Sequence, residues 1–174
     1  LWQEQGLPPL RIAVNLSPRQ FQQRDLAQRI RSLIDQPDFL PEYLELEITE
    51  SSLIDPKMNV STMERLKQLG TRLTVDDFGT GYSSLGHLRQ LPINCLKIDQ
   101  SFIREIEDGK GGMFAETIVA LSQKLGVSTI AEGVETIEQA SFLRGLGCTT
   151  AQGYLFGKPM PLNQLIEWMA HQPK

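Results

Sequence analysis

Histidine and cysteine are scarce in this sequence, which limits the metal and redox sites that it can build. Two His and two Cys occur among 174 residues, and neither pair has the spacing of zinc ligands. We expect His87 and His171 to lie at the surface. Cys95 and Cys148 lie in apolar, strand-like stretches and are predicted to be reduced core residues of a cytosolic protein. The sequence therefore excludes a His-rich metal centre and a disulfide framework.

Long apolar runs and an excess of positive charge are also absent. No stretch is long enough to span a bilayer, and no signal peptide is recognised. The 17 basic and 21 acidic residues give a net charge of −4. We therefore expect no DNA binding and no general attraction to anionic membranes. A cytoplasmic location is expected, and upstream segments could tether the parent protein to a membrane.

The sequence has no glycine-rich phosphate loop after its first expected strand, where it reads Asn15-Leu16-Ser17-Pro18. Strand-like and helix-like segments nevertheless alternate along the chain, which predicts a parallel sheet with helices outside it. The expected strands are 11–16, 43–48, 72–75, 93–98, 127–131 and 148–151. Without the phosphate loop of an open doubly wound sheet, and with polar residues at many strand ends, a barrel is favoured.

The helices are predicted from apolar residues at helical spacing. They cover 18–34, 58–69, 113–125, 137–146 and 161–169, with short helical turns at 85–89 and 102–106. Thr136 and Gln139 have the positions of a capping box at the start of one of them. In the last helix, Leu165, Trp168 and Met169 are expected to pack in the core.

The stretch 74–85 is the one around which the other motifs are arranged. Asp76 and Asp77 follow a short apolar strand, and adjacent side chains of a strand point to opposite faces. The two carboxylates can therefore share one site only where the strand ends and the backbone turns. Gly79 and Gly81 are expected to supply this turn, because glycine adopts positive φ at little cost. Alone, such a pair is more often an exposed acidic loop than a metal site.

Polar residues recur at the ends of all the expected strands. They are Asn15, Glu47, Asp76 with Asp77, Lys97 with Asp99, Glu132 and Gln152. Each by itself is more often a solvated surface residue, but the strand ends of a barrel converge on one cavity. Hard oxygen ligands suit Mg²⁺ or Mn²⁺. Several carboxylates with one Lys could hold two ions that act on a phosphoryl group, which predicts metal-dependent phosphoryl chemistry.

The motifs, in this order and at this spacing, resemble those of EAL domains, the cyclic di-GMP phosphodiesterases of bacteria. The resemblance rests on residues 15–17, 47–50, 76–85, 97–99, 131–135, 152–154 and 158–159, which read NLS, EITE, DDFGTGYSSL, KID, AEGVE, QGY and KP. It implies a modified (β/α)8 barrel of the TIM type. The implied reaction is hydrolysis of cyclic di-GMP to linear pGpG with two Mg²⁺ or Mn²⁺ ions.

The resemblance also implies a role for each matched residue. The implied metal ligands are Asn15, Glu47, Asp76, Asp77, Asp99 and Glu132. Asp77 would hold the second ion and the attacking water, Lys97 would position or help to deprotonate that water, and Asp99 would support the second ion. Catalytic roles are therefore expected for Lys97, Asp77 and Glu132.

Substrate binding and loop positioning are implied for a further set. Gln152 would sit beside the water or the substrate, and Glu50 would hold the glycine loop. The loop residues in this set are Phe78, Gly79, Thr80, Gly81, Tyr82 and Ser83. In the family this loop couples substrate and metal binding to dimerisation, so the likeness implies a homodimer as well. It also implies an upstream sensor, receiver or GGDEF domain in the parent protein.

The Glu-Ala-Leu signature itself is absent, which departs from the family pattern. The family's Glu on the first strand is a metal ligand, and a nearby Arg contacts the nucleotide. We expect residues 1–174 to be a single EAL domain fragment with about six strand–helix units, lacking the two N-terminal units of the barrel. The alternative is a catalytically inactive cyclic di-GMP receptor, or a module used for dimerisation and interaction.

Overall fold

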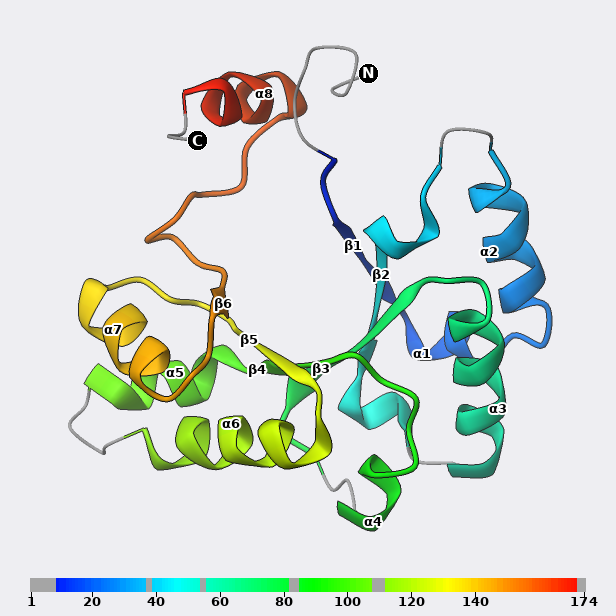
Figure 1. Cartoon of the computed structure of the whole chain (residues 1–174), viewed down its shortest axis with the longest axis horizontal. Coiled ribbons are helices and arrows are strands. Elements are labelled where there is room, and N and C mark those ends of the chain that lie inside the picture. The colour runs from blue at the N-terminus through cyan, green and yellow to red at the C-terminus, as the bar shows by residue number, and fades with distance from the viewer. Residues whose placement is uncertain (1–8, 37–38, 54–55, 82–84, 108–111, 172–174) are drawn as a thin grey trace.

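A computed structural model of the chain describes residues 9–36, 39–53, 56–81, 85–107 and 112–171. Six parallel strands form one sheet whose order follows the chain. They are β1 (Ile12–Leu16), β2 (Leu44–Thr49), β3 (Arg72–Phe78), β4 (Cys95–Ile98), β5 (Ser128–Ala131) and β6 (Thr150–Ala151). The sheet curves as an incomplete barrel, with most of the helices along its convex side (Figure 1). The expected α/β barrel of about six strand–helix units is confirmed.

Helices and helical turns connect the strands and cover the sheet. The α-helices are α1 (Pro18–Phe21), α2 (Leu26–Ile34), α3 (Pro56–Lys67), α4 (Leu85–Leu88), α5 (Gln100–Glu107), α6 (Met113–Leu125), α7 (Ile137–Gly145) and α8 (Leu162–Ala170). Short 3₁₀ segments, η2 (Pro41–Tyr43) and η3 (Glu50–Leu53), flank β2. None of the helices that the structure describes is long and apolar enough to cross a membrane.

Several predicted elements differ from the structure, and the expected strand 148–151, for example, is only Thr150–Ala151. The expected helix 18–34 is two helices, because a capping box at Ser17 starts α1 and the helix ends at the C-cap Gln22. The expected helical turn at 102–106 is the eight-residue helix α5. The third strand does not end at Val75 but runs on through both aspartates to Phe78.

The two faces of the sheet differ in polarity because successive side chains alternate. The outward-facing residues of the central strands are almost fully buried against the helices: Leu46, Ile48, Leu73, Val75, Leu96 and Ile98 are at most 1% exposed. Met63 and Leu66 of α3 and Ile103 of α5 complete this layer, each with 0% exposure. The opposite, inward face carries polar and charged side chains. The hydrophobic core therefore lies outside the barrel wall, and the polar site lies within it.

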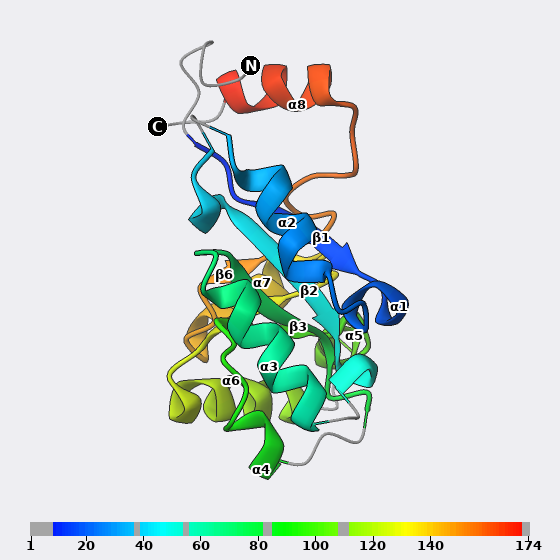
Figure 2. The same ribbon diagram turned by 90° about the vertical axis from the view of Figure 1, so that its right-hand side faces the viewer.

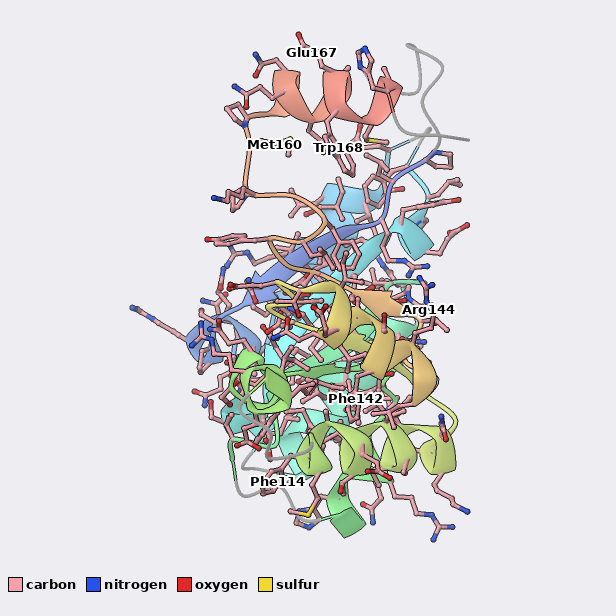
Figure 3. All side chains as sticks on the ribbon, turned by 90° about the vertical axis from the view of Figure 1, so that its left-hand side faces the viewer. Phe114, Phe142, Arg144, Met160, Glu167 and Trp168 are labelled. Atoms are coloured by element: carbon pink, nitrogen blue, oxygen red, sulfur yellow. The ribbon has the colours of Figure 1, made fainter. Side chains whose placement is uncertain are left out.

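The first strand and the last helix are the least covered described elements. Ile12 and Val14 of β1 are 44% and 43% exposed. Helix α8 lies apart from the other helices (Figure 2), and none of its residues is buried. Trp168 is on the side of α8 that faces the rest of the molecule (Figure 3) but remains 41% exposed. The expectation that α8 packs in the core is wrong, because no residue of α8 is buried by the part of the chain that the structure describes.

The cysteine and histidine predictions agree with the structure. Cys95 and Cys148 are both buried and unpaired. His87 and His171 are both exposed.

Candidate active site

Lys97 is the centre of a charged cluster on the inward face of the sheet. Its Nζ lies 2.8 Å from Glu47 Oε1, 3.1 Å from Asp76 Oδ1 and 2.6 Å from Glu132 Oε1. These partners come from β2, β3 and the residue after β5, while Lys97 itself is on β4. Its side chain is only 4% exposed. One buried ammonium group thus joins carboxylates from three other segments, as the convergence of strand ends predicts.

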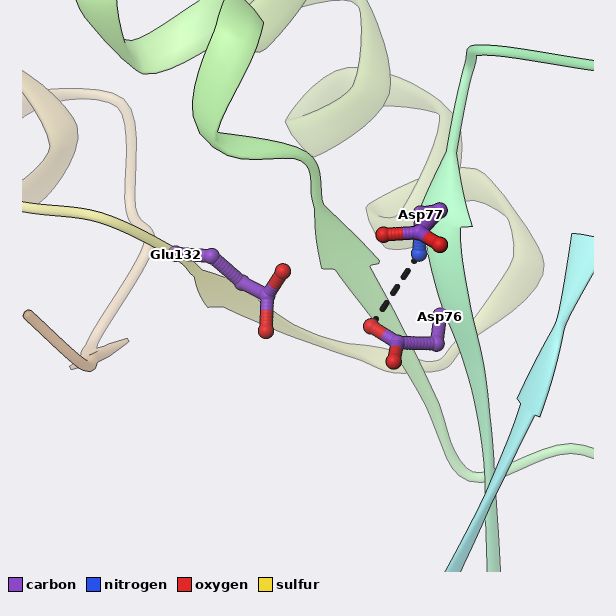
Figure 4. Close-up of side chains that lie close together, drawn as sticks. All are labelled: Asp76, Asp77 and Glu132. Atoms are coloured by element: carbon purple, nitrogen blue, oxygen red, sulfur yellow. Dashed lines mark hydrogen bonds between the residues drawn. The ribbon is translucent and has the colours of Figure 1, made fainter. Parts of the chain in front are cut away.

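A β-bulge, and not the end of the strand, brings Asp76 and Asp77 to the same side. Val75 pairs with Leu96 and Phe78 with Ile98, so β3 has one more residue than β4 in this interval. Asp77 has a left-handed φ of 54°, which is uncommon for a residue other than glycine. Its backbone N–H donates to Asp76 Oδ1 at 3.1 Å (Figure 4). The expected sharing of one site is correct, but the proposed turn at Gly79 and Gly81 is not its cause.

Asp76, Asp77 and Glu132 form the tightest carboxylate group in the described part of the chain. One oxygen of each lies within 4.8 Å of the other two (Figure 4). Burial raises the pKa of Asp77, and the charges of Asp76 and Asp99 add to the effect. Burial also raises the pKa of Glu132, against the lowering effect of Lys97. Carboxylates that repel one another at this distance are stabilised by a cation between them.

The pKa of Lys97 responds to two opposing effects. Burial lowers it, but the hydrogen-bonded carboxylates of Glu132 and Glu47 raise it by more, so the pKa lies above its ordinary value. The side chain is therefore a charged donor at neutral pH. A buried ammonium with several carboxylate partners is far less costly than one without them.

Asn15 and Asp99 lie at the margins of the cluster. Asn15 is exposed on the edge strand β1, where it is in register with Glu47 and shares its face. Asp99 follows β4 and contributes to the raised pKa of Asp77 through its charge. Its Oδ1 accepts a hydrogen bond of 2.9 Å from the backbone N–H of Ser101 in the first turn of α5. Asp99 therefore holds the start of this helix as well as facing Asp77.

Gln152 extends the cluster beyond the last strand. Its Nε2 donates to Glu132 Oε1 at 2.6 Å, the oxygen that also contacts Lys97. Glu132 is thus oriented from two sides, by an amide and by an ammonium group. The structure thus places Gln152 against Glu132, and the expectation that Gln152 lies beside the water or the substrate stays a prediction.

Glu50 holds the glycine loop, as predicted. Its Oε2 accepts hydrogen bonds from the backbone N–H of Gly79 at 2.9 Å and of Gly81 at 3.1 Å. Gly79 has a φ of 100° that strongly favours glycine. Gly81 is favoured for a different reason, since a Cβ there would lie 3.0 Å from the Glu50 carboxyl carbon and Glu50 would have to shift. The loop is therefore attached to η3, directly after β2, through the carboxylate of Glu50, which is only 5% exposed.

Two of the remaining predicted loop residues lie in the described part of the chain. Phe78 is 7% exposed and belongs to the core. The hydroxyl of Thr80 donates to the backbone oxygen of Asp77 at 2.8 Å, which supports the bulge from the loop side. Tyr82 and Ser83 lie outside the described residues.

A cavity of about 650 Å³ adjoins the cluster on the side of β6. Its lining includes Gln152, which also contacts Glu132, together with Glu135 and Arg104. Glu135 belongs to a quoted motif but received no role from the sequence. Arg104 was missed altogether, because it lies within α5, where it donates to Gln100 Oε1 at 2.9 Å. Helical spacing after Asp99 was the signal that could have placed it at this end of the sheet.

The EAL domain family matches residues 1–159 of the chain. This chain belongs to the EAL domain family. Among curated relatives, the cyclic di-GMP phosphodiesterase NbdA of Pseudomonas aeruginosa is 43% identical over 94% of the chain, which corresponds to 21% of NbdA. The bifunctional diguanylate cyclase/cyclic di-GMP phosphodiesterase MucR of the same organism is 42% identical over 98% of the chain and 25% of MucR. The EAL chain thus spans a fifth to a quarter of the length of these relatives.

Solved structures of EAL domains have the same fold. The cyclic di-GMP complex of the PaMucR phosphodiesterase superposes with a TM-score of 0.89 at 42% identity, over 94% of this chain and 67% of that one. The EAL domain of Mycobacterium smegmatis DcpA gives a TM-score of 0.90 at 32% identity, over 97% and 77%. Klebsiella pneumoniae BlrP1, in a manganese/cyclic di-GMP complex, gives 0.77 at 28%, over 91% and 42%. The six-stranded arrangement is therefore part of an EAL barrel.

Proposed function

We propose that this chain provides most of the active site of a metal-dependent phosphodiesterase that hydrolyses cyclic di-GMP to linear pGpG. The observation that carries the proposal is the convergence of Glu47, Asp76 and Glu132 on Lys97, beside the carboxylate of Asp77. Relatives that are 43% and 42% identical to the chain over the matched region are a cyclic di-GMP phosphodiesterase and a bifunctional diguanylate cyclase/cyclic di-GMP phosphodiesterase. A solved relative with the same fold holds cyclic di-GMP.

The donor set fits divalent cations of the Mg²⁺ or Mn²⁺ type. Asp76, Asp77 and Glu132 offer oxygen atoms within 4.8 Å of one another, and hard oxygen donors favour such ions over Zn²⁺. We assign these residues, together with Asn15, Glu47 and Asp99, as the chain's ligands for two ions. When bound, the ions would activate water and offset negative charge on the phosphoryl oxygens.

The chain's own residues then orient the reactants. Lys97 contacts Glu47 at 2.8 Å and Glu132 at 2.6 Å, so its side chain holds both carboxylates in place, which supports a positioning role for it. Gln152 fixes the Glu132 carboxylate through its 2.6 Å hydrogen bond. In the reaction, the oxygen of water bonds to phosphorus and one P–O3′ bond breaks. One proton of the water stays on the new phosphate oxygen and the other ends on the released 3′-oxygen, which leaves a 5′-phosphate on the linear product.

The assembly and location of the protein are further parts of the proposal. We infer a homodimer, because the Glu50-held loop of this chain matches the loop that the family couples to dimerisation. An upstream sensor, receiver or GGDEF domain is consistent with the bifunctional relative MucR. The cytoplasmic location and the single-domain fragment of residues 1–174 remain predictions.

The test is cyclic di-GMP hydrolysis by a longer protein in which this chain is joined to the strand–helix units that complete the barrel. With Mn²⁺ or Mg²⁺ we expect pGpG, and we expect Glu47→Ala and Asp76→Ala each to reduce the rate by at least about 100-fold. Glu64→Ala changes an exposed carboxylate of α3 and serves as the control. Binding of the dinucleotide without any cleavage would favour the inactive receptor instead.

A further inference from the structure

A second polar layer lies beneath the proposed metal site, on the same inward face of the sheet. Glu45, Thr74 and Cys95 each precede a residue of the charged cluster by two positions on β2, β3 and β4. Inward-facing residues of a barrel stack in layers in this way. All three are nearly inaccessible, with exposures of 3%, 0% and 1%. None of them has a role in the proposed reaction.

Thr74 and Glu45 are joined across two neighbouring strands. The Thr74 hydroxyl donates to Glu45 Oε1 at 2.6 Å. In the register of the sheet, Thr74 lies beside Glu47 while Glu45 lies beside Arg72, so the hydrogen bond runs diagonally between β2 and β3. A diagonal bond resists sliding of one strand past the other. Glu47 and Asp76 lie two residues further along the same two strands, so a shift between these strands would also displace their carboxylates.

Two arginine side chains connect Glu45 to the strands on either side of β2. Glu45 Oε2 lies 3.8 Å from Arg11 Nε, just before β1, and 3.7 Å from Arg72 Nε on β3. Arg72 Nε is buried and has no hydrogen-bond partner among the described residues, so these are charge contacts beyond hydrogen-bond length. The Glu45 carboxylate is thus compensated from both sides, and it lies between the strands that carry Asn15 and Asp76.

We propose that Thr74 and Glu45 are positioning residues that set the spacing of Glu47 and Asp76, and through it the affinity of the EAL site for divalent metal. The inference rests on the proposed metal-dependent function. Groups that orient metal ligands without touching the metal commonly change affinity by about 10- to 100-fold when they are removed. A purely structural role would instead require only that the volume at residue 74 be filled.

Two substitutions at residue 74 separate the effect of the hydroxyl group from the effect of the side-chain shape. Thr74→Val keeps the branched shape and removes the donor, whereas Thr74→Ser keeps the donor and removes a methyl group. Mn²⁺ binding is measured by titration calorimetry on the complete EAL-containing protein, with thermal unfolding in EDTA as the measure of folding. We expect Thr74→Val to bind Mn²⁺ about tenfold more weakly, and Thr74→Ser to stay within about twofold of the unsubstituted protein.

Glu45→Gln provides a second test of the proposed positioning role. It keeps an oxygen acceptor for Thr74 but removes the charge that faces Arg11 and Arg72, so we expect an intermediate loss of about threefold in Mn²⁺ affinity. This variant carries the test if Thr74→Val does not fold. For both variants, kcat at saturating Mn²⁺ is expected to recover, because positioning affects binding of the metal more than the step that follows.

The possible outcomes separate this inference from the proposed function. Equal Mn²⁺ affinity for the unsubstituted protein and for the folded variants, with hydrolysis intact, would overturn the positioning role and leave the phosphodiesterase proposal standing. An unsubstituted protein that neither binds Mn²⁺ nor cleaves cyclic di-GMP would overturn both. A larger affinity loss for Thr74→Ser than for Thr74→Val would assign the effect to packing and also refute the positioning role.

Discussion

At the scale of single residues, the site depends on one buried ammonium group and the carboxylates around it. The residue types at strand ends were predictable, because the motifs are local in sequence. The role of Lys97 as the common partner of Glu47, Asp76 and Glu132 was not predictable, since these contacts join residues up to 50 positions apart. Side-chain chemistry is local information, whereas pairing among side chains depends on how the strands are placed.

Removal of the Lys97 charge is expected to destabilise the protein in the absence of metal. Lys97→Met leaves buried carboxylates without their cation, which costs about 3 kcal/mol of unfolding free energy in EDTA. Part of this loss should be recovered in Mn²⁺, because a bound cation again compensates the carboxylates. Denaturant unfolding with and without Mn²⁺ measures both effects. Lys124→Met removes an exposed charge on α6 as the control, and an equal loss in EDTA and Mn²⁺ would contradict the expectation.

Asp77 makes a pH-dependent contribution that can be isolated by one substitution. Its pKa is raised by burial and then by Asp76 and Asp99, so the folded protein holds the Asp77 proton more tightly than the unfolded chain does. This stabilisation is complete below the unfolded pKa of 3.8, and it is lost as the pH rises through the raised folded pKa.

Asp77→Asn removes this titration and still tolerates the left-handed φ of 54°. In EDTA at pH 7 we expect the variant to melt about 1 to 3 °C above the unsubstituted protein, and the difference to shrink toward pH 4. Thermal unfolding at several pH values measures this trend. Asp77→Ala is the control for backbone strain and should be less stable than Asp77→Asn throughout. A difference that grows toward low pH would refute the assignment.

At the scale of elements, capping and alternation were predictable and the irregularities were not. The expected capping box at Thr136 is present: its side chain accepts from Gln139 N, and the Gln139 side chain accepts from the Thr136 backbone. The bulge at Asp76 and Asp77 was missed, because it is a mismatch between β3 and β4 that neither strand shows alone. Its effect is to direct two consecutive carboxylates into one site.

The Thr136 cap gives a test of element stability at a distance from the charged cluster. Thr136→Ala is expected to reduce the unfolding free energy by about 1 kcal/mol, because the start of α7 loses its side-chain acceptor. Thr136→Ser keeps the hydroxyl and should retain most of the stability. Denaturant unfolding distinguishes the two variants. Equal losses would show that the methyl group matters and that the hydroxyl does not.

At the scale of the whole molecule, the six strands form an open part of a barrel. The edge strand β1 exposes Ile12 and Val14, and β6 is only two residues long. A strand edge without a partner favours association with another chain. Helix α8, with no buried residue, adds a second face that is not covered by the described part of the chain.

The 174-residue polypeptide by itself is therefore expected to associate as its concentration rises. Light scattering after size exclusion should show a larger mass at higher concentration, and Val14→Lys should reduce this association by placing a charge on the edge strand. Leu33→Lys, at a residue of α2 that is 69% exposed, is the matched control and should have little effect. A monomer at every concentration would refute both this expectation and association through these edges.

The sequence alone determined the class of the fold and the residue types at the strand ends. Period-two and helical patterns act over a few residues, so alternating strands and helices could be inferred directly. The carboxylate and amide side chains at the strand ends predicted a site for hard divalent cations, because such cations prefer oxygen ligands. Only the tertiary structure decided that a bulge joins Asp76 to Asp77, that Lys97 connects three carboxylates, and that α8 lies outside the core. These features depend on register and on packing between distant segments, which local patterns do not encode.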